Sequence, residues 1–427
     1  MEDQISKRNK ETRIMKEDIE KNDLSKDDKR NKIKRRGGMK KYQRWIIILI
    51  SLSISIFFVI PYIKTFTFGF NGKMEEGKRL HHWIGRGYKY QRVEDPILNE
   101  DHDKAKGVLL SVVFPHELNK FIRTMQTMED SFNVNFNYDW LILSNETFHQ
   151  RDLTTLRGLA SGKIQFGLIP EDEIRYPTNT DKKKMEKNME KFVDKKVPFA
   201  KSMEMRQKNR YFSKFFYKHA LLQPYDYFWR VDPDAVILCK IDYDVFRFMK
   251  DNNKTFGFIS GSHTYAEVVD GLWNVTSKFM NNHPQLINKN NLIKFVKNDK
   301  DEFNRCQFLT NWEIASFKMF RNDKYEAYSA YLESLQGFFN ELWPDNMVHT
   351  LFASIYLDRE ELYHFKNMGF DYNPFRICPI ENEILARERC GCFATDDFTW
   401  HRLSCIPQYY ELMGLTKKAP VSHNNYG

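Results

Sequence analysis

The sequence has no internal repeat and, after residue 104, no long segment rich in proline, glycine or serine. These two absences argue against a repeat architecture and against separately linked domains. We therefore expect one compact domain over residues 105–427. With 41% hydrophobic and 15% aromatic residues, the chain has enough apolar material for a buried core, which disordered chains lack.

Excess positive charge is also missing from most of the chain. Residues 1–44 hold 16 Lys and Arg against 9 Asp and Glu, a net charge of +7 out of the +9 of the whole sequence. The remainder is close to neutral and offers no general basic surface. We therefore expect no nucleic-acid partner.

The sequence contains no two cysteines with two residues between them, the spacing typical of structural zinc sites. Its six cysteines are Cys239, Cys306, Cys378, Cys390, Cys392 and Cys405. An even number suits disulfides in an oxidising compartment, and fifteen pairings are possible. Zinc binding is the weaker interpretation.

One long uncharged segment, Trp45–Ile63 (WIIILISLSISIFFVIPYI), stands near the N-terminus. About 19 apolar residues suffice to cross a bilayer as a helix. A cleaved signal peptide would usually lie at the extreme N-terminus and have a shorter apolar core. Because more than 40 polar residues precede this segment, we interpret it as an uncleaved transmembrane anchor.

Charge on the N-terminal side of the anchor predicts its direction. Six basic residues crowd the approach to the span: Lys34, Arg35, Arg36, Lys40, Lys41 and Arg44. The positive-inside rule keeps that side in the cytoplasm. Residues 1–44 are then a disordered cytoplasmic tail, 64–104 a luminal stem and 105–427 a luminal domain. Three Asn-X-Ser/Thr patterns, at Asn145, Asn253 and Asn274, support this only weakly, since the motif is common.

Strand-like and helix-like segments alternate in the first half of the domain. Apolar runs predict buried strands at Gly107–Phe114, Asp139–Leu143 and Gly162–Ile169. Further strands are predicted at Tyr227–Val231 and Ala235–Leu238. Helical spacing or charge predicts helices at Glu117–Phe132 and Asp181–Lys196. This alternation is typical of an α/β fold whose sheet is mostly parallel in its first half.

Two aspartates, Asp232 and Asp234, follow the predicted strand Tyr227–Val231 directly. Carboxylates at a strand end can hold Mn²⁺ or Mg²⁺ through hard oxygen ligands and leave coordination sites for phosphate oxygens. The cation would neutralise a leaving diphosphate, as a sugar-nucleotide transferase requires. The tripeptide alone favours a capped turn over a metal site, because Asp-X-Asp occurs by chance in many chains.

The surrounding sequence resembles the fungal type II α-1,2-mannosyltransferases, glycosyltransferase family 15. The segments that carry the resemblance are Tyr225–Phe246 (YDYFWRVDPDAVILCKIDYDVF), Phe136–Phe148, Lys163–Pro177, Cys306–Ile314 (CQFLTNWEI), Gly337–His349 (GFFNELWPDNMVH) and Phe375–Pro379. They occur in the family's order and extend over nearly the whole predicted luminal part.

The resemblance implies a GT-A-like nucleotide-diphospho-sugar transferase fold, with GDP-mannose as donor and Mn²⁺ as cofactor. It implies transfer with retention to the 2-hydroxyl of mannose on a glycoprotein acceptor, in the Golgi. Asp232 takes the place of the family's metal carboxylate, and Glu313 that of its proposed nucleophile. The candidate residues that contact the cofactor or donor are Asp234, Asp345 and His349.

Several positions depart from the family pattern. The metal carboxylate is Asp232 rather than glutamate, a mild change of one methylene. The family's tyrosine near the reaction centre falls on Met205, which cannot donate a hydrogen bond, and Tyr211 is a candidate displaced substitute. A strand-end arginine falls on Phe114, which removes a phosphate-binding donor.

The fourth departure concerns the predicted metal site. The family's metal-binding histidine falls on Tyr372, a poorer ligand, with Asp371 adjacent as a possible replacement. The main interpretation is an α-1,2-mannosyltransferase. The alternatives are a catalytically weakened member that binds a glycan or a partner protein, and transfer of a different sugar or phospho-sugar.

Overall fold

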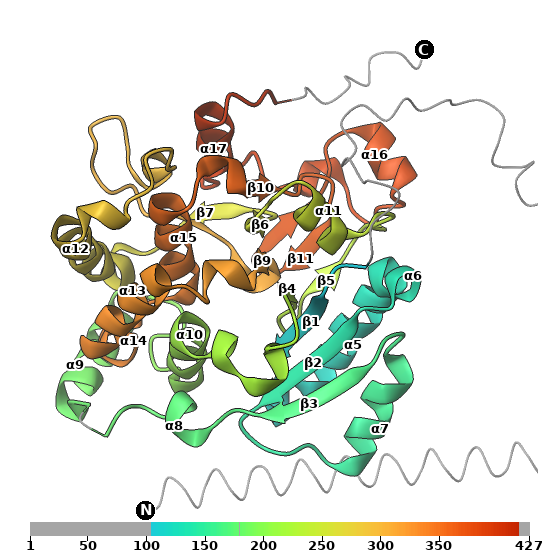
Figure 1. Cartoon of the computed structure of the whole chain (residues 1–427), viewed down its shortest axis with the longest axis horizontal. Helices are drawn as coiled ribbons and strands as arrows, with labels where there is room; N and C mark the ends of the chain where they lie inside the picture. Colours follow the sequence, from blue (N-terminus) through green and yellow to red (C-terminus); the bar gives the residue numbers. More distant parts are fainter. Residues whose placement is uncertain (1–103, 179, 418–427) are drawn as a thin grey trace, which may run out of the picture. The chain divides into compact units, whose positions relative to one another are not determined.

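The computed structural model describes residues 104–178 and 180–417 (Figure 1). The predicted tail, the predicted anchor Trp45–Ile63 and nearly all of the predicted stem lie outside these residues. In the part of the chain that the structure describes, no helix combines the length and the apolar character that a membrane crossing requires.

A sheet of seven strands forms the centre of the fold, in the order β10-β6-β9-β4-β1-β2-β3. Its strands are β1 (Gly107–Val112), β2 (Asp139–Ser144), β3 (Ile164–Leu168), β4 (Tyr227–Arg230), β6 (Phe256–Phe258), β9 (Ile314–Ser316) and β10 (Leu362–His364). The first four strands along the chain run parallel, as predicted. β9 runs antiparallel to both β4 and β6.

The predicted strands are confirmed with small shifts. β1 ends at Val112, before the predicted Phe114, because a 3-10 turn begins at Pro115. β3 lies at the edge of the sheet and its residues are only partly buried. The expectation that Gly162–Ile169 is a buried strand was therefore wrong, because an edge strand has a neighbouring strand on one side only.

Side-chain alternation along the strands builds a core on each face of the sheet. In β1, Val108 and Leu110 point into one core and Leu109 into the other, all with 0% exposure. In β4, Phe228 and Trp229 divide in the same way. Burial on both faces explains why these strands read as continuous apolar runs.

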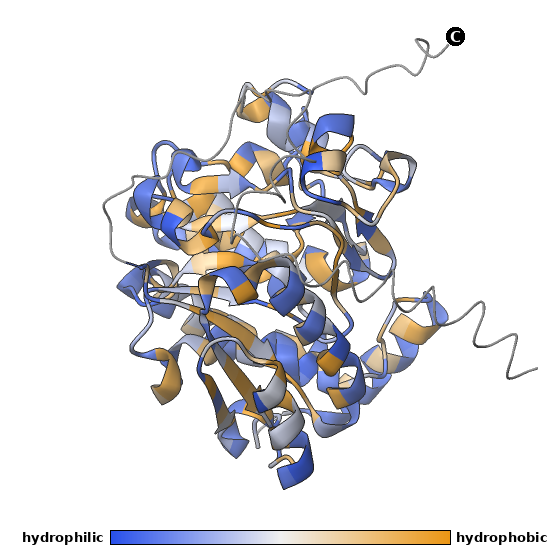
Figure 2. Cartoon of the chain, turned by 90° about the vertical axis from the view of Figure 1, so that its right-hand side faces the viewer, coloured by the Kyte–Doolittle hydropathy of each residue, from blue (hydrophilic) through white to orange (hydrophobic). Residues whose placement is uncertain are grey.

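Helices cover both faces (Figure 1). On one face lie α8 (Glu171–Ile174), α9 (Lys182–Asp194), α10 (Met203–Lys214), α12 (Ala266–Asn282), α13 (Asp323–Ser334), α14 (Gly337–Asn340), α15 (Asp345–Tyr356) and α17 (Ile406–Leu412). On the other lie α5 (Leu118–Met128), α7 (Gln150–Leu159) and α11 (Val245–Asp251). Figure 2 shows hydrophobic residues along the strands and hydrophilic residues on many outward-facing helical surfaces.

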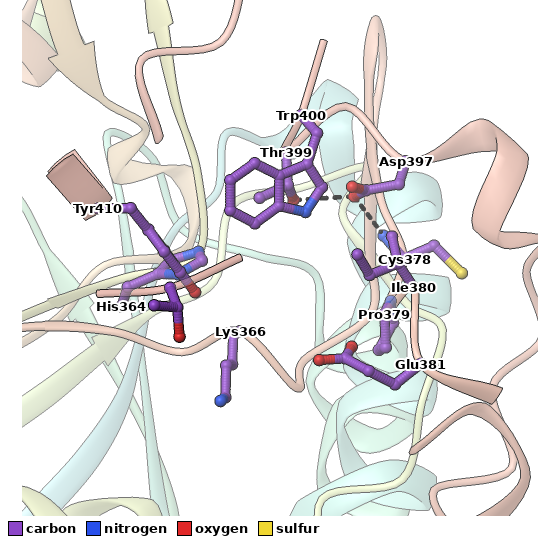
Figure 3. A pocket seen from close by; sticks show the side chains of 11 residues that line it. His364, Lys366, Cys378, Pro379, Ile380, Glu381, Asp397, Thr399, Trp400 and Tyr410 are labelled. Carbon is purple, nitrogen blue, oxygen red and sulfur yellow. Dashed lines mark hydrogen bonds between the residues drawn. The ribbon is translucent and has the colours of Figure 1, made fainter. Parts of the chain in front are cut away.

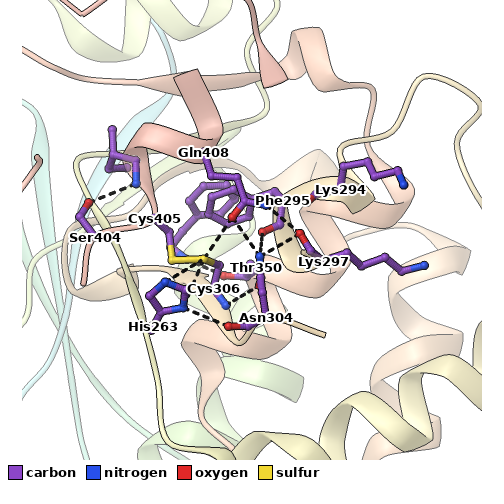
Figure 4. The surroundings of a disulfide bond; sticks show 12 residues. His263, Lys294, Phe295, Lys297, Asn304, Cys306, Thr350, Ser404, Cys405 and Gln408 are labelled. Atoms are coloured by element: carbon purple, nitrogen blue, oxygen red, sulfur yellow. Dashed lines mark hydrogen bonds between the residues drawn. A yellow bond between two sulfur atoms is a disulfide. The ribbon is translucent and has the colours of Figure 1, made fainter. Parts of the chain in front are cut away.

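Two smaller sheets and three disulfides complete the described part. β5 (Val236–Ile237), β11 (Phe370–Tyr372) and β12 (Phe375–Ile377) form one sheet, and β7 (Gly261–His263) and β8 (Cys306–Phe308) the other. The disulfides are Cys239–Cys390, Cys306–Cys405 (Figure 4) and Cys378–Cys392. All six cysteines are thus paired, which confirms the disulfide expectation and leaves no thiolate for zinc.

Candidate active site

The loop after β4 carries the two aspartates predicted from the sequence. β4 ends at Arg230, and Asp232 and Asp234 follow at its carboxyl end. The strand order reverses beside this loop, because β1 has β2 on one side and β4 on the other. Ligands of open α/β sheets bind outside the carboxyl ends of the strands at such a reversal. The aspartates therefore lie where a nucleotide site is expected.

Arg230 fixes the orientation of Asp232. Its Nε and Nη2 donate to the two oxygens of Asp232 at 2.8 and 2.9 Å, and its guanidinium lies 3.6 Å from the ring centroid of Phe212. Burial alone would lower the pKa of Arg230, but Asp232 and Asp345 outweigh burial and raise it. Arg230 is thus a permanently charged guanidinium that binds both oxygens of the predicted metal carboxylate, Asp232.

Asp345 joins this cluster from the first residue of α15, where the helix terminus favours a carboxylate. Its Oδ2 accepts hydrogen bonds from Nη1 of Arg230 and, at 2.8 Å, from Oγ1 of Thr310. Asn311 donates from Nδ2 to Oδ2 of Asp232 at 2.9 Å. Asp232 and Asp345, which are far apart in the sequence, thus share the guanidinium group of Arg230.

Glu313 and His349 form a second, deeper pair next to this cluster. Both side chains have 0% exposure, and Nδ1 of His349 lies 2.7 Å from Oε2 of Glu313. The other ring nitrogen lies 3.1 Å from the carbonyl oxygen of Phe212, which can only accept. Burial alone would lower the pKa of His349, but Glu313 and Asp345 reverse the effect and raise it. A charged imidazolium therefore satisfies both contacts.

These contacts define the position of each member of the pair. Because both nitrogens of His349 are engaged inside the protein, this side chain positions Glu313 and does not face a ligand, which differs from the predicted cofactor contact. Oε1 of Glu313 is buried and accepts no hydrogen bond from the described residues. The main-chain oxygen of Glu313 accepts from the amide of Arg230 at 2.8 Å, which links this pair to the first cluster.

Asp234 lies apart from the buried groups. Its side chain is 58% exposed, and its Oδ2 lies 2.7 Å from Nζ of Lys120 on α5. Its φ of +75° is in the left-handed region, which non-glycine residues rarely adopt and which is often found at functional sites. Asp234 is therefore an exposed carboxylate paired with Lys120 rather than a member of the Arg230 cluster.

Tyr372, the position of the family's histidine, lies close to the predicted metal carboxylate. Burial, Asp232 and Asp234 all raise the pKa of its phenol, so Tyr372 is held neutral. Its neighbour Asp371 pairs with Arg376 at 2.5 Å from Oδ2 to Nη2. Adjacent strand residues point to opposite faces, so Asp371 does not replace the histidine here.

A lysine packs against Phe114, where the family has an arginine. Nζ of Lys208 on α10 lies 4.6 Å from the centroid of the Phe114 ring. The same Nζ contacts both oxygens of Glu117 at 2.6 and 2.7 Å and one oxygen of Glu204 at 2.9 Å. This cation is therefore already paired with two carboxylates.

The remaining departures lie on α10. Met205 is half-buried and packs against the core. Tyr211 has 0% exposure, and its hydroxyl makes no hydrogen bond within the described residues. Burial, with a contribution from Glu173, raises the pKa of Tyr211. The suggestion that Tyr211 replaces the lost tyrosine at the reaction centre was wrong, because its side chain is enclosed in the core.

The donor set at this edge fits a hard divalent cation. Asp232 and Asp234 supply carboxylate oxygens on one short loop, and the phenol of Tyr372 lies within the electrostatic influence of both. Oxygen ligands of this kind suit Mn²⁺. Oδ2 of Asp232 accepts hydrogen bonds from both Arg230 and Asn311, which engage its two lone pairs. Oδ1 accepts from Nε of Arg230 and keeps a second lone pair for a cation.

A separate cavity of about 30 Å³ lies beside β10 (Figure 3). His364, Asp397 and Trp400 are among the residues that line it. A cavity of this size can hold about one or two waters, which is too small for a sugar. It contains none of the predicted site residues and is not the donor site.

Sequence reasoning missed Arg230, Thr310 and Asn311. A signal for Arg230 was available, since residues i and i+2 of a strand share a face and Arg230 precedes Asp232 by two. Asn311 gave no such signal, because the fold brings it to Asp232 from 79 residues away. The same holds for Thr310, which contacts Arg230 across 80 residues and Asp345 across 35.

Comparison with known proteins identifies the family. The model of the glycolipid 2-alpha-mannosyltransferase family matches residues 70–414. The chain is 39% identical over 336 residues to the alpha-1,2 mannosyltransferase KTR1 of Saccharomyces cerevisiae, with 78% of this chain and 85% of the relative covered. It is 36% identical to glycolipid 2-alpha-mannosyltransferase 1 of Candida albicans, with 73% and 72% covered.

Solved structures agree in fold. Core-mannan synthase A from Aspergillus fumigatus, in an Mn/GDP form, matches with a TM-score of 0.69 and 26% identity, over 75% of this chain and 88% of that one. The mannosyltransferase Ktr4p from S. cerevisiae in complex with GDP matches with a TM-score of 0.64 and 30% identity, over 67% and 76%. The chain therefore has a mixed α/β glycosyltransferase fold and belongs to the glycolipid 2-alpha-mannosyltransferase family.

Proposed function

We propose that this protein is an α-1,2-mannosyltransferase that moves mannose from GDP-mannose to the 2-hydroxyl of an acceptor mannose with retention. Its acceptors are mannosylated N- or O-glycans of glycoproteins, such as those of cell-wall mannan. The observation that carries the proposal is the cluster of Arg230, Asp232 and Asp345 at the carboxyl end of β4. A related chain with the same fold has a structure in an Mn/GDP form.

The chain's own residues prepare the donor side of this site. Asp232 would hold Mn²⁺, with the exposed Asp234 and the phenol of Tyr372 beside it. Bound Mn²⁺ supplies neutralisation of the charge that develops on the leaving diphosphate. Arg230 keeps Asp232 in one orientation before the donor arrives, so little reorganisation is needed during the reaction.

In the transfer, the bond between the anomeric carbon and the diphosphate oxygen breaks, and GDP leaves with the electron pair. A bond forms between the anomeric carbon and the acceptor's 2-oxygen on the same face. The hydroxyl proton passes to a phosphate oxygen of the departing GDP, which acts as the base. Glu313, with one oxygen held by His349, either stabilises positive charge at the anomeric carbon or attacks it. Because Glu313 is fully buried, direct attack would require the neighbouring chain to move.

We further propose that the protein is a type II Golgi membrane protein. Trp45–Ile63 is the span, 1–44 the cytoplasmic tail, 64–104 the stem and 105–427 the luminal catalytic domain. Charge flanking the span supports this direction. The three disulfides support an oxidising compartment.

Turnover of the full-length protein in detergent tests the activity. With GDP-mannose, Mn²⁺ and methyl-α-mannoside, we expect GDP release that requires the metal and is abolished by Asp232→Ala. Asp301→Ala is a matched control, because Asp301 is an exposed carboxylate that contacts Lys294 and Lys297. If the native chain binds GDP with Mn²⁺ but shows no turnover, the catalytically weakened alternative replaces this proposal.

A further inference from the structure

The three Asn-X-Thr patterns of the chain differ sharply in their structural settings. Asn253 is exposed in the turn between α11 and β6, with a left-handed φ of +50°. Asn274 is exposed but lies in the interior of α12. Asn145 follows β2 and is half-buried, with its Oδ1 enclosed. An attached glycan is bulky and needs a solvent-facing position, which disfavours Asn145 and leaves Asn253 and Asn274 to be compared.

The sheet topology places Asn253 away from the donor site. β9 runs antiparallel to both β4 and β6, so β4 and β6 point in the same direction. Asn253 precedes the start of β6, whereas Asp232 follows the end of β4. The two residues therefore lie at opposite ends of the strands of this sheet. Asn145 follows the end of β2, which is parallel to the strands next to it, so it shares the edge of the donor site.

The threonine of the Asn253 pattern, Thr255, gives a kinetic argument for modification at this site. The hydroxyl of Thr255 donates to Glu361 at 2.6 Å, a contact that spans 106 residues. At a synthesis rate of about 5–20 residues per second, this contact cannot form until several seconds after Asn253 is made. The pattern stays accessible during that interval.

The setting of Asn274 is less favourable. In a helix, residues i and i+2 do not face each other, and here Asn274 is exposed while Thr276 has 0% exposure and bonds to the hydroxyl of Tyr328 at 2.8 Å. The neighbouring Trp273 stacks on Phe303, with 4.8 Å between ring centroids. A transferase that reads Asn and Thr together would have to unwind the middle of α12, a helix that forms from local contacts.

We propose that Asn253 carries an N-linked glycan and that Asn145 and Asn274 do not. In this modification, Nδ2 of Asn253 forms a bond to the anomeric carbon of an oligosaccharide carried on a lipid diphosphate. The bond from that carbon to the diphosphate oxygen breaks, the lipid diphosphate leaves, and the amide loses a proton. The proposal rests on the luminal placement proposed above.

Expression of the full-length chain in a eukaryotic secretory host tests the assignment. We expect one endoglycosidase-sensitive step in gel mobility, which Asn253→Gln removes and which Asn145→Gln and Asn274→Gln leave unchanged. Thr255→Ser is the matched control, because it retains both the hydroxyl and the acceptor pattern. GDP release by Asn253→Gln shows that this variant is folded.

Persistence of the full mobility step in Asn253→Gln would overturn the assignment. Protease added to sealed vesicles separates this failure from failure of the luminal placement. If residues after 104 are protected but no step is seen, only the glycosylation proposal is wrong. If they are digested, the luminal placement and the glycosylation proposal both fail, while the transferase assay still reports on activity.

Discussion

Replacing Arg230 by methionine is the sharpest test of the site described above. Arg230 is the shared partner of Asp232 and Asp345, and its side chain is 5% exposed. Arg230→Met removes the guanidinium that both carboxylates share and leaves them with little access to solvent, since their side chains are 11% and 4% exposed. Removing one partner of a buried ion pair typically costs about 3–5 kcal/mol. We therefore expect the free energy of unfolding to fall by about that amount.

Urea unfolding followed by intrinsic tryptophan fluorescence measures this loss. The matched control is Arg305→Met, because Arg305 pairs with Asp270 in the same two-pronged geometry, at 2.8 and 2.9 Å. The side chains of that pair are 40% and 44% exposed, and an exposed pair contributes only about 0–1 kcal/mol. The difference between the two variants measures the combined effect of burial and of the additional partners of Arg230, chiefly Asp345.

Manganese provides a second readout of the same variant. Without Arg230 the site carries one more uncompensated negative charge, so a divalent cation should stabilise Arg230→Met more than it stabilises the native protein. Arg230→Met/Asp345→Asn should recover part of the stability without the metal, because one carboxylate is neutralised. If Arg230→Met unfolds within about 1 kcal/mol of Arg305→Met, the buried charge cluster does not exist as described.

Three further predictions concern the buried pairs and a disulfide. His349→Leu should lower the free energy of unfolding by about 3–5 kcal/mol at pH 7, since it leaves Glu313 buried without its partner. Because the pKa of His349 is raised in the folded state, the stabilisation by this pair is complete below about pH 6.5 and is lost as pH rises through the folded pKa. A native profile of stability against pH without this alkaline decline would contradict the pairing. His364 has its pKa lowered to about 4 by burial, so stability should fall by up to about 3 kcal/mol as pH drops from 6.5 to 4, and His364→Gln should flatten that acid limb in urea titrations. Cys306→Ser/Cys405→Ser opens a loop of 99 residues and should lower stability by about 4–5 kcal/mol on the chain-entropy model, which a thermal midpoint equal to that of the native protein would refute.

Much of the fold followed from local sequence alone. The strands β1, β2 and β4 were predictable because burial on both faces demands continuous apolar runs, such as GVLLSV in β1. The helix α9 was predictable from its charged, amphipathic pattern, and Asp181 caps it by accepting from the amide of Lys184. The exposure of β3 was not, because its position at the edge depends on strand order, which no local pattern encodes.

For the site, the sequence by itself determined which chemistry is available. Asp232 and Asp234 stand directly after a buried strand, and the surrounding motifs placed the chain in its family. Tertiary structure alone decided how these groups are used. It joined Arg230 to Asp345, placed Asp234 beside Lys120, and enclosed His349 between Glu313 and a main-chain carbonyl. These contacts join residues far apart along the chain, and their distances and burial depend on how the whole domain packs.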